Sequence, residues 1–320
     1  FGFGKGIGSG SSFTMRGIGS YGIGAAVVSS LVTNMNGHSV GTGQFVDLGF
    51  MDIERVEVLK GPQGTLNGRN SVQGVINLIT KRPTSEMGGY VDIESGNFDR
   101  TLIKGAINIP ISDNISSRVA FMSNQRSGMV HNANTGNDYD DRNDTGIRLS
   151  IDWNLSDITD LKLTYSGQKS DDNRPQEEVS FCAQDQFFGC SPYSRGGMNQ
   201  AADTRGHVAG LFGFYSLIDP GTIVNKYGPS LAGRFDTLYL DREPTHYQES
   251  EVTNLELTHE LNDDVQMIVK YTYSTRDFHQ MNDNDGSVSN VSLLGVGAAL
   301  GLPPVEANVC FGGDVQFCEM

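Results

Sequence analysis

The sequence predicts an all-β protein in which a small α+β region precedes a long antiparallel sheet. Three observations support this fold class. From Gly88 onward, apolar and polar side chains alternate with a period of two, which is typical of strands that have one apolar face. Before that point, β-branched segments are separated by glycine-rich turns. The chain also has no run of eighteen apolar residues, so it does not predict a membrane-spanning helix.

Charge divides the 320-residue chain into two parts, although the total is a net −15. Residues 1–84 carry seven basic and four acidic side chains, a net charge of +3. The remaining residues carry sixteen basic and thirty-four acidic side chains, a net charge of −18. This step predicts a domain boundary near Pro83–Glu86. The acidic excess also argues against nucleic acid as a partner, because phosphate contacts require Lys and Arg.

The N-terminal part predicts short strands joined by glycine-rich turns. The segment "RVEVLKG" (55–61) alternates as a strand does, and "GVINLITK" (74–81) predicts a second strand. Between residues 25 and 37, "AAVVSSLVTNMNG" predicts a strand that ends in a turn at Asn36–Gly37. We therefore expect a small sheet in this part of the chain.

The match to G-x-G-x-x-G at Gly17, Gly19 and Gly22 is interpreted as chance. The segment after it is β-branched and ends in a turn, whereas a dinucleotide site needs a helix there. No repeated βαβ units follow, and the phosphate-loop pattern is also missing from the sequence. A nucleotide-binding function is not predicted.

Seven antiparallel strands are expected in the C-terminal part, each with one apolar and one strongly polar face. Their alternating segments are Val91–Glu94, Ile103–Ile109, Arg118–Phe121, Ile147–Trp153, Leu161–Ser166, Asn254–Thr258 and Val265–Tyr273. A soluble β-sandwich is one architecture that fits this pattern. A wall of a β-barrel in a membrane is the other.

Two further features favour the membrane barrel over the sandwich. Connections near 110–114, 154–160 and 262–264 are short, whereas those near 127–143, 169–250 and 275–320 are long; the first connection, at 97–100, is a short exception. Aromatic residues towards the strand ends suit an interfacial girdle; they are Trp153, Tyr165, Tyr271 and Tyr273. We therefore predict part of an antiparallel transmembrane β-barrel.

Three motifs in the N-terminal part resemble one family. They are "MRG" (Met15–Gly17), "ERVEVLKGPQGTLNGRN" (Glu54–Asn70) and "GVINLITKRPT" (Gly74–Thr84). In order and spacing they are similar to the plug of TonB-dependent outer-membrane receptors. The resemblance implies that residues 1–84 are the second half of an N-terminal plug domain and that residues 85–320 are the first part of a barrel with long extracellular loops. The seven expected strands would then be about seven of roughly 22. In one place the chain departs from the family pattern, since Asn36 stands where plugs usually carry Asp.

The resemblance also implies a function in the outer membrane of a Gram-negative bacterium. Similar proteins take up bulky, scarce nutrients, most often ferric siderophores. They are driven by the TonB energy-coupling complex, which acts through an N-terminal box that we expect outside this chain. Lipopolysaccharide and outer-membrane lipid are the other implied partners. The plug motif residues expected at the plug–barrel contact are Arg16, Gly17, Arg55, Glu57, Lys60, Gly61 and Pro62.

The four cysteines form two local pairs with the same spacing, Cys182 with Cys190 and Cys310 with Cys318. Zinc sites use tighter ligand spacing, usually with histidine, and no histidine lies near either pair in the sequence. We predict two disulfides that stiffen exposed loops, which implies an oxidising compartment.

Residues for catalysis are not apparent in the sequence. The six histidines are scattered, and no nucleophile motif or paired-carboxylate motif accompanies them.

The acidic stretch Asn137–Asp144 is interpreted as a solvated loop, since it lacks the order of a calcium-binding loop. The aromatic and Arg-rich insert at 169–250 is interpreted as packing on itself, with ligand recognition as the other possibility. We expect neither an enzyme nor a cofactor or metal. The alternative function is a secreted or surface β-sandwich that binds or adheres without transport, and a surface enzyme is a third.

Overall fold

The computed structural model describes residues 2–6, 10–15, 18–19, 31–40, 51–67, 70–174, 184–185, 189–190, 237–238 and 243–281. The chain divides into two compact units. The first comprises residues 1–126, 142–172 and 246–280, and the second comprises 127–141, 173–245 and 281–320. No helix in the described ranges is long and apolar enough to cross a membrane.

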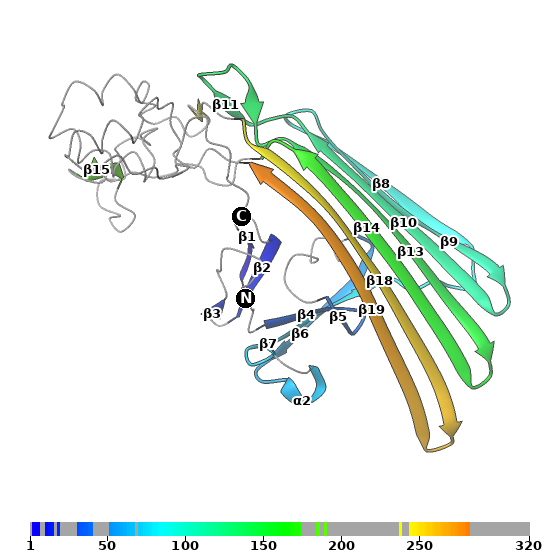
Figure 1. Ribbon diagram of the computed structural model, residues 1–320. Helices are drawn as coiled ribbons and strands as arrows, with labels where there is room; N and C mark the ends of the chain where they lie inside the picture. The colour runs from blue at the N-terminus through cyan, green and yellow to red at the C-terminus, as the bar shows by residue number, and fades with distance from the viewer. Residues whose placement is uncertain are drawn as a thin grey trace, which may run out of the picture. The chain divides into compact units, whose positions relative to one another are not determined.

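A seven-stranded antiparallel sheet, which we call the wall, dominates the first unit (Figure 1). Its order is β19-β18-β14-β13-β10-β9-β8, so each strand pairs with the next long strand along the chain. This confirms the predicted fold class and the seven predicted strands. The strands are β8 (Gly88–Gly96), β9 (Arg100–Ser112), β10 (Ile115–Arg126), β13 (Arg142–Ser156), β14 (Thr159–Asp172), β18 (Thr245–Asn262) and β19 (Val265–Met281).

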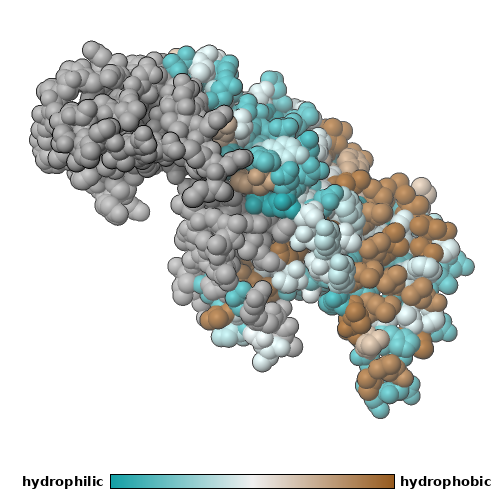
Figure 2. Space-filling model, in the orientation of Figure 1, coloured by the Kyte–Doolittle hydropathy of each residue, from teal (hydrophilic) through white to brown (hydrophobic). Residues whose placement is uncertain are grey.

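The register places apolar and polar side chains on opposite faces of the wall. Val119 lies opposite Ile107 and Leu149 on one face. Its neighbour Arg118 lies opposite Asn108 and Ser150 on the other. The polar members are buried, whereas large apolar side chains of the first face, such as Ile147 and Val269, are about half exposed. Figure 2 shows hydrophobic residues gathered over the wall. The apolar side therefore faces outward, as the alternation predicts for a lipid-facing surface.

Tight turns connect the wall strands at one end, and in each a side chain just before the turn accepts a hydrogen bond from the turn backbone. The β9–β10, β13–β14 and β18–β19 connections are two-residue turns at 113–114, 157–158 and 263–264. In the last, Asp264 N donates to Asn262 Oδ1 at 3.0 Å, a side-chain turn that Asn favours. The short connections predicted here are confirmed.

The plug, as we call the described residues up to Thr84, contains a four-stranded sheet of order β5-β4-β7-β6. β4 runs parallel to β7, and β6 runs antiparallel to β7. A small apolar core of Met15, Leu31, Ile76 and Leu78 holds this sheet against β2. The bounds are β4 (Leu31–Met35), β5 (His38–Ser39), β6 (Ile53–Lys60), α2 (Gly64–Asn67) and β7 (Gly74–Thr80); a separate sheet contains β1 (Gly2–Gly6), β2 (Gly10–Met15) and β3 (Ile18–Gly19).

The second unit is described only in short pieces. β11 (Val130–Asn132) pairs antiparallel with β12 (Asp138–Tyr139) and parallel with β17 (Thr237–Leu238). β15 (Gln184–Asp185) pairs antiparallel with β16 (Gly189–Cys190). The side chain of Cys190 and the residues Cys182, Cys310 and Cys318 lie outside the described part of the chain, so the two predicted disulfides stay predictions.

Candidate functional site

Three short plug segments touch the polar face of the wall, and all belong to the first unit. The first is the β4–β5 turn at residues 36–38, the second is Met51–Asp52 just before β6, and the third is the stretch at 81–84 just after β7. Each lies at an end of a plug strand, where the chain leaves the sheet and its side chains are free to reach outward. These segments and their wall partners form the candidate site.

The β4–β5 turn has the sequence that its backbone requires. Asn36 and Gly37 have φ of +53° and +74°, and two successive positive φ values define the hairpin turn for which Asn-Gly is preferred. The Asn36 amide fixes the turn on β7, because its Nδ2 donates to Thr80 Oγ1 and its Oδ1 accepts from Thr80 N, both at 3.0 Å. A side chain at position 37 would come within 2.9 Å of Lys270 Nζ on the wall.

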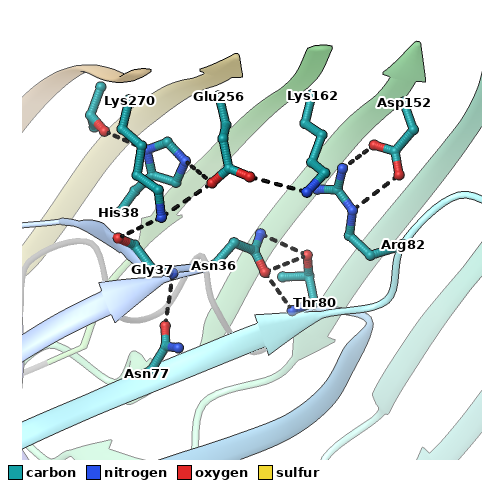
Figure 3. A network of polar contacts seen from close by, with 11 residues as sticks. Asn36, Gly37, His38, Asn77, Thr80, Arg82, Asp152, Lys162, Glu256 and Lys270 are labelled. Atoms are coloured by element: carbon teal, nitrogen blue, oxygen red, sulfur yellow. Dashed lines mark hydrogen bonds and ion pairs between the residues drawn. The ribbon is translucent and has the colours of Figure 1, made fainter. Parts of the chain in front are cut away.

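The turn presents His38 to a carboxylate on the wall (Figure 3). Its Nε2 lies 3.8 Å from Glu256 Oε2, and its Nδ1 lies 3.1 Å from Thr272 Oγ1. Glu256 also pairs with Lys162 at 3.0 Å and with Lys270 at 3.1 Å. Burial lowers the pKa of His38, and Lys270 and Arg82 lower it further, against the opposing effect of Glu256. His38 is therefore mainly neutral at pH 7.

Charges alternate along one cross-strand row of the wall. Asp152 on β13 lies opposite Lys162 on β14, which lies opposite Glu256 on β18. Lys270 on β19 extends the row through its ion pair with Glu256. The plug adds Arg82, whose Nε donates to Asp152 Oδ2 at 3.2 Å and whose Nη2 contacts Oδ1 (Figure 3). The two wall carboxylates that the plug contacts, Asp152 and Glu256, therefore each already have a lysine opposite them on a neighbouring strand.

A second contact, on β8 to β10, is buried more deeply. Asp52 and Arg118 form a two-pronged pair, with Nε to Oδ2 at 2.6 Å and Nη2 to Oδ1 at 2.7 Å. Their side chains are only 2% and 7% exposed. Tyr90 donates a third hydrogen bond to Asp52 Oδ1 at 3.1 Å, and Arg118 Nη1 donates to Asn108 at 2.9 Å. Paired charges of this kind tolerate burial because their hydrogen bonds are satisfied.

Apolar packing accompanies this buried pair. Met51 packs on Ala106 and Ala120, which lie directly opposite each other on β9 and β10. The small alanines let the plug backbone come close to the wall. Nearby Arg148 on β13 is almost fully buried, and it donates to Ser166 Oγ at 2.9 Å and to the Met51 carbonyl.

The structure describes only some of the plug motif residues that were predicted at the plug–barrel contact. Arg55 is exposed and donates to Glu57 at 2.9 Å and to Glu54 at 2.8 Å, all on β6. Asn77 donates to Glu57 at 2.9 Å, and this hydrogen bond and the Arg55 contact lower the pKa of Glu57. Lys60 is exposed at the end of β6, and Gly61 and Pro62 follow it. Their contact with the wall stays a prediction, and Arg16 and Gly17 lie outside the described residues.

Asp52, His38 and Arg82 were missed as contact residues by the sequence analysis. Arg82 lies in the recognised motif segment Gly74–Thr84, and His38 follows the Asn-Gly turn. The one available signal was position, since all three flank predicted plug strands. The structure adds their partners on the wall, which are far away in sequence.

A cavity of about 320 Å³ lies between the turn, the end of β7 and the wall strands β13, β14 and β18. Its lining combines paired charges with neutral polar groups. The lining residues are Asn36, His38, Ile79, Arg82, Asp152, Lys162, Thr164, Asn254 and Glu256.

Comparison with known proteins agrees with this architecture. Residues 2–75 match the family described as TonB-dependent Receptor Plug Domain. The pesticin receptor of Yersinia pestis is 37% identical over 90 residues, 27% of this chain and 13% of that protein. The iron-regulated outer membrane virulence protein of Vibrio cholerae is 29% identical over 170 residues, 49% of this chain and 23% of that protein. The chain thus spans less than a quarter of the length of these relatives.

The fold is shared with a solved structure at low sequence identity. The crystal structure of the ferric yersiniabactin uptake receptor FyuA from Yersinia pestis superposes with a TM-score of 0.60 at 15% identity, covering 87% of this chain and 37% of that chain. A plug joined to an antiparallel wall with a polar inner face defines the class of plugged β-barrel proteins. Within that class, the N-terminal part of the chain matches the plug domain of TonB-dependent receptors.

Proposed function

We propose that this chain is part of an outer-membrane receptor that imports a bulky, scarce nutrient, with a ferric siderophore as the substrate class. The observation that carries the proposal is the two-sided wall. Its apolar face is exposed and its polar face holds the plug through Asp52, His38 and Arg82. A lipid-embedded wall around a polar stopper suits gated passage of a polar solute.

The arrangement supports binding and gating without a covalent step. A closed plug blocks the lumen, so passage requires the plug to shift or rearrange. The contacts at His38 and Arg82 are ion pairs and hydrogen bonds that can break singly, each at modest cost where water reaches them. We infer that the TonB energy-coupling complex supplies the work.

The proposed substrate class comes from the relatives. One relative is named as iron-regulated, and one solved structure is titled a ferric yersiniabactin uptake receptor. We therefore propose ferric siderophores as the ligand class of this chain.

Uptake measurements test this function. Cells that lack the gene would be compared with cells that carry the full-length gene, using radioactive iron complexed by a catecholate, a hydroxamate and an α-hydroxycarboxylate siderophore. We expect one complex to be imported only with the gene, and import to stop when the proton gradient is collapsed. Equal uptake of every complex by the two strains would contradict the proposal.

Localisation separates the receptor from the alternative of a secreted β-sandwich adhesin. The full-length protein is expected in the outer-membrane fraction and to need detergent for extraction, with lipopolysaccharide and outer-membrane lipid as its neighbours. A monodisperse full-length protein in buffer without detergent would favour the adhesin. Surface binding without iron uptake would favour it as well.

A further inference from the structure

The cavity between plug and wall contains a polar side chain that the described contacts leave unused. Asn254 on β18 is 4% exposed and lines the cavity. Neither its Nδ2 nor its Oδ1 has a hydrogen-bond partner among the described residues. Leaving a buried amide without hydrogen-bond partners is unfavourable, so this position implies a ligand that supplies them.

The neighbours of Asn254 make the site polar but nearly neutral. Thr164, its cross-strand partner on β14, is also buried and lines the same cavity. The charged lining residues are already matched, Arg82 by Asp152 and Lys162 by Glu256. His38 has a lowered pKa and adds little positive charge at pH 7. A free ion would therefore find no uncompensated charge of opposite sign among these lining groups.

The volume and the position of the cavity further restrict which molecules could bind in it. A volume of about 320 Å³ corresponds to about ten water molecules at the share of volume that water has in the liquid. The cavity also lies between the plug and the wall, where an imported solute would pass when the plug shifts. The Asn254 amide offers both donor and acceptor atoms, so it matches hydroxyl and amide groups, which also combine the two.

We propose that this cavity is a transit site, in which Asn254 and Thr164 bind neutral hydroxyl and amide groups of the imported solute as it passes the plug. This inference rests on the proposed function. In this site, Asn254 contacts the solute directly. The paired charges around Asn254 keep the cavity hydrated but do not bind an ion.

Replacing Asn254 tests the transit site in the full-length receptor. Asn254→Leu is close in shape but apolar, whereas Asn254→Ser keeps a donor and an acceptor. Uptake of the siderophore complex that the wild type imports is expected to fall about tenfold in Asn254→Leu and to stay within about twofold in Asn254→Ser. Thr164→Val, the second variant, is expected to lower uptake about threefold.

A merely structural role predicts the opposite order. Removing an unpartnered buried amide should leave the unfolding temperature unchanged or raise it, so Asn254→Leu would then import normally. Wild-type uptake by Asn254→Leu, at wild-type abundance in the outer membrane, would overturn the transit site and leave the receptor function intact. A wild-type receptor that imports none of the complexes would instead contradict the proposed function, and with it the transit role.

Soaking crystals of the full-length receptor in glycerol gives a second readout that does not depend on uptake. Glycerol is a neutral probe with hydroxyl groups only, and we expect one hydroxyl within hydrogen-bond distance of the Asn254 amide. Binding at crystal concentration only, with no change of uptake in Asn254→Leu, would count against the transit role. Water alone at Asn254 would count against the site.

Discussion

The plug meets the wall in two contrasting regions. At Met51–Asp52, a buried two-pronged ion pair is surrounded by apolar packing on β9 and β10. At Arg82, an ion pair with Asp152 lies beside a cavity, and its side chains are 30% and 24% exposed. Neutral His38 lies nearby against Glu256, whose two lysine partners are 41% exposed. The first region resembles a protein core, and the second resembles a wet interface between two proteins.

This difference indicates how such a plug can be both secure and removable. Breaking a buried pair strands a charge in a region of low dielectric constant, which is costly. Breaking a partly exposed pair exchanges one partner for water at little cost. We infer that the Asp52 region anchors the plug and that the partly exposed Arg82–Asp152 contact yields first.

The largest expected effect is at the anchor. Asp52→Asn keeps a residue type that tolerates the φ of +52° at this position, but it removes the carboxylate from buried Arg118. We expect a loss of about 3–5 kcal/mol in the free energy of unfolding of the full-length receptor, measured with denaturant in detergent. The double variant Asp52→Asn, Arg118→Gln should regain much of this loss. A cost below about 1 kcal/mol for Asp52→Asn would remove the distinction between the two regions.

A test of the two wall faces comes next in size. Val269 lies on the exposed apolar face, whereas its neighbour Lys270 points to Glu256 and the Gly37 carbonyl. Val269→Arg should cost about 2–4 kcal/mol if the position lies near the bilayer midplane, measured by refolding into lipid vesicles. The matched variant Lys270→Met should cost less than about 1 kcal/mol. The reverse order would mean that the faces are assigned wrongly.

A smaller effect is expected at the charge row. Glu256→Gln removes the common partner of Lys162, Lys270 and His38, yet water reaches both lysines. We expect a loss of about 1 kcal/mol that shrinks in 1 M salt, since salt screens exposed pairs strongly. Asp52→Asn in the same salt series serves as the control, because its buried pair should respond little. Equal salt dependence of both variants would contradict the assignment.

The smallest expected effect is a pH dependence at His38. Its folded-state pKa lies below the ordinary value of 6.5, so the unfolded chain binds the proton more readily. The contribution of neutral His38 to stability is present above pH 6.5 and is lost as the pH falls from 6.5 through the folded-state pKa. Thermal unfolding between pH 7.5 and 5.5 should show a steeper loss for the wild type than for His38→Gln. Parallel curves would show that His38 does not carry the effect.

The wall could be predicted from sequence because one physical rule acts along its whole length. Lipid outside and water or plug inside force side chains to alternate, and segments such as Ile147–Trp153 display that alternation directly. The Asn36–Gly37 turn was predictable for a local reason as well, since positive φ at two successive positions strongly favours Asn-Gly.

The contacts of the plug were not predictable in the same way. Asp52 and Arg82 are single charges beside strands, and their partners Arg118 and Asp152 lie far along the chain. A charge on the inner face of the wall has the same sequence pattern as one that faces water. Such partners meet only when the plug sheet packs against the wall. No local sequence pattern encodes how these two sheets are placed against each other.

The alternating row Asp152, Lys162, Glu256, Lys270 has a consequence for the import cycle that we propose. When Arg82 and His38 move away, each carboxylate of the row still has a lysine beside it on the next strand. The vacated wall therefore keeps its own electrical balance and has little tendency to capture passing ions or to collapse inward. A plug that leaves such a surface would therefore meet the same charge pattern on the wall when it returns.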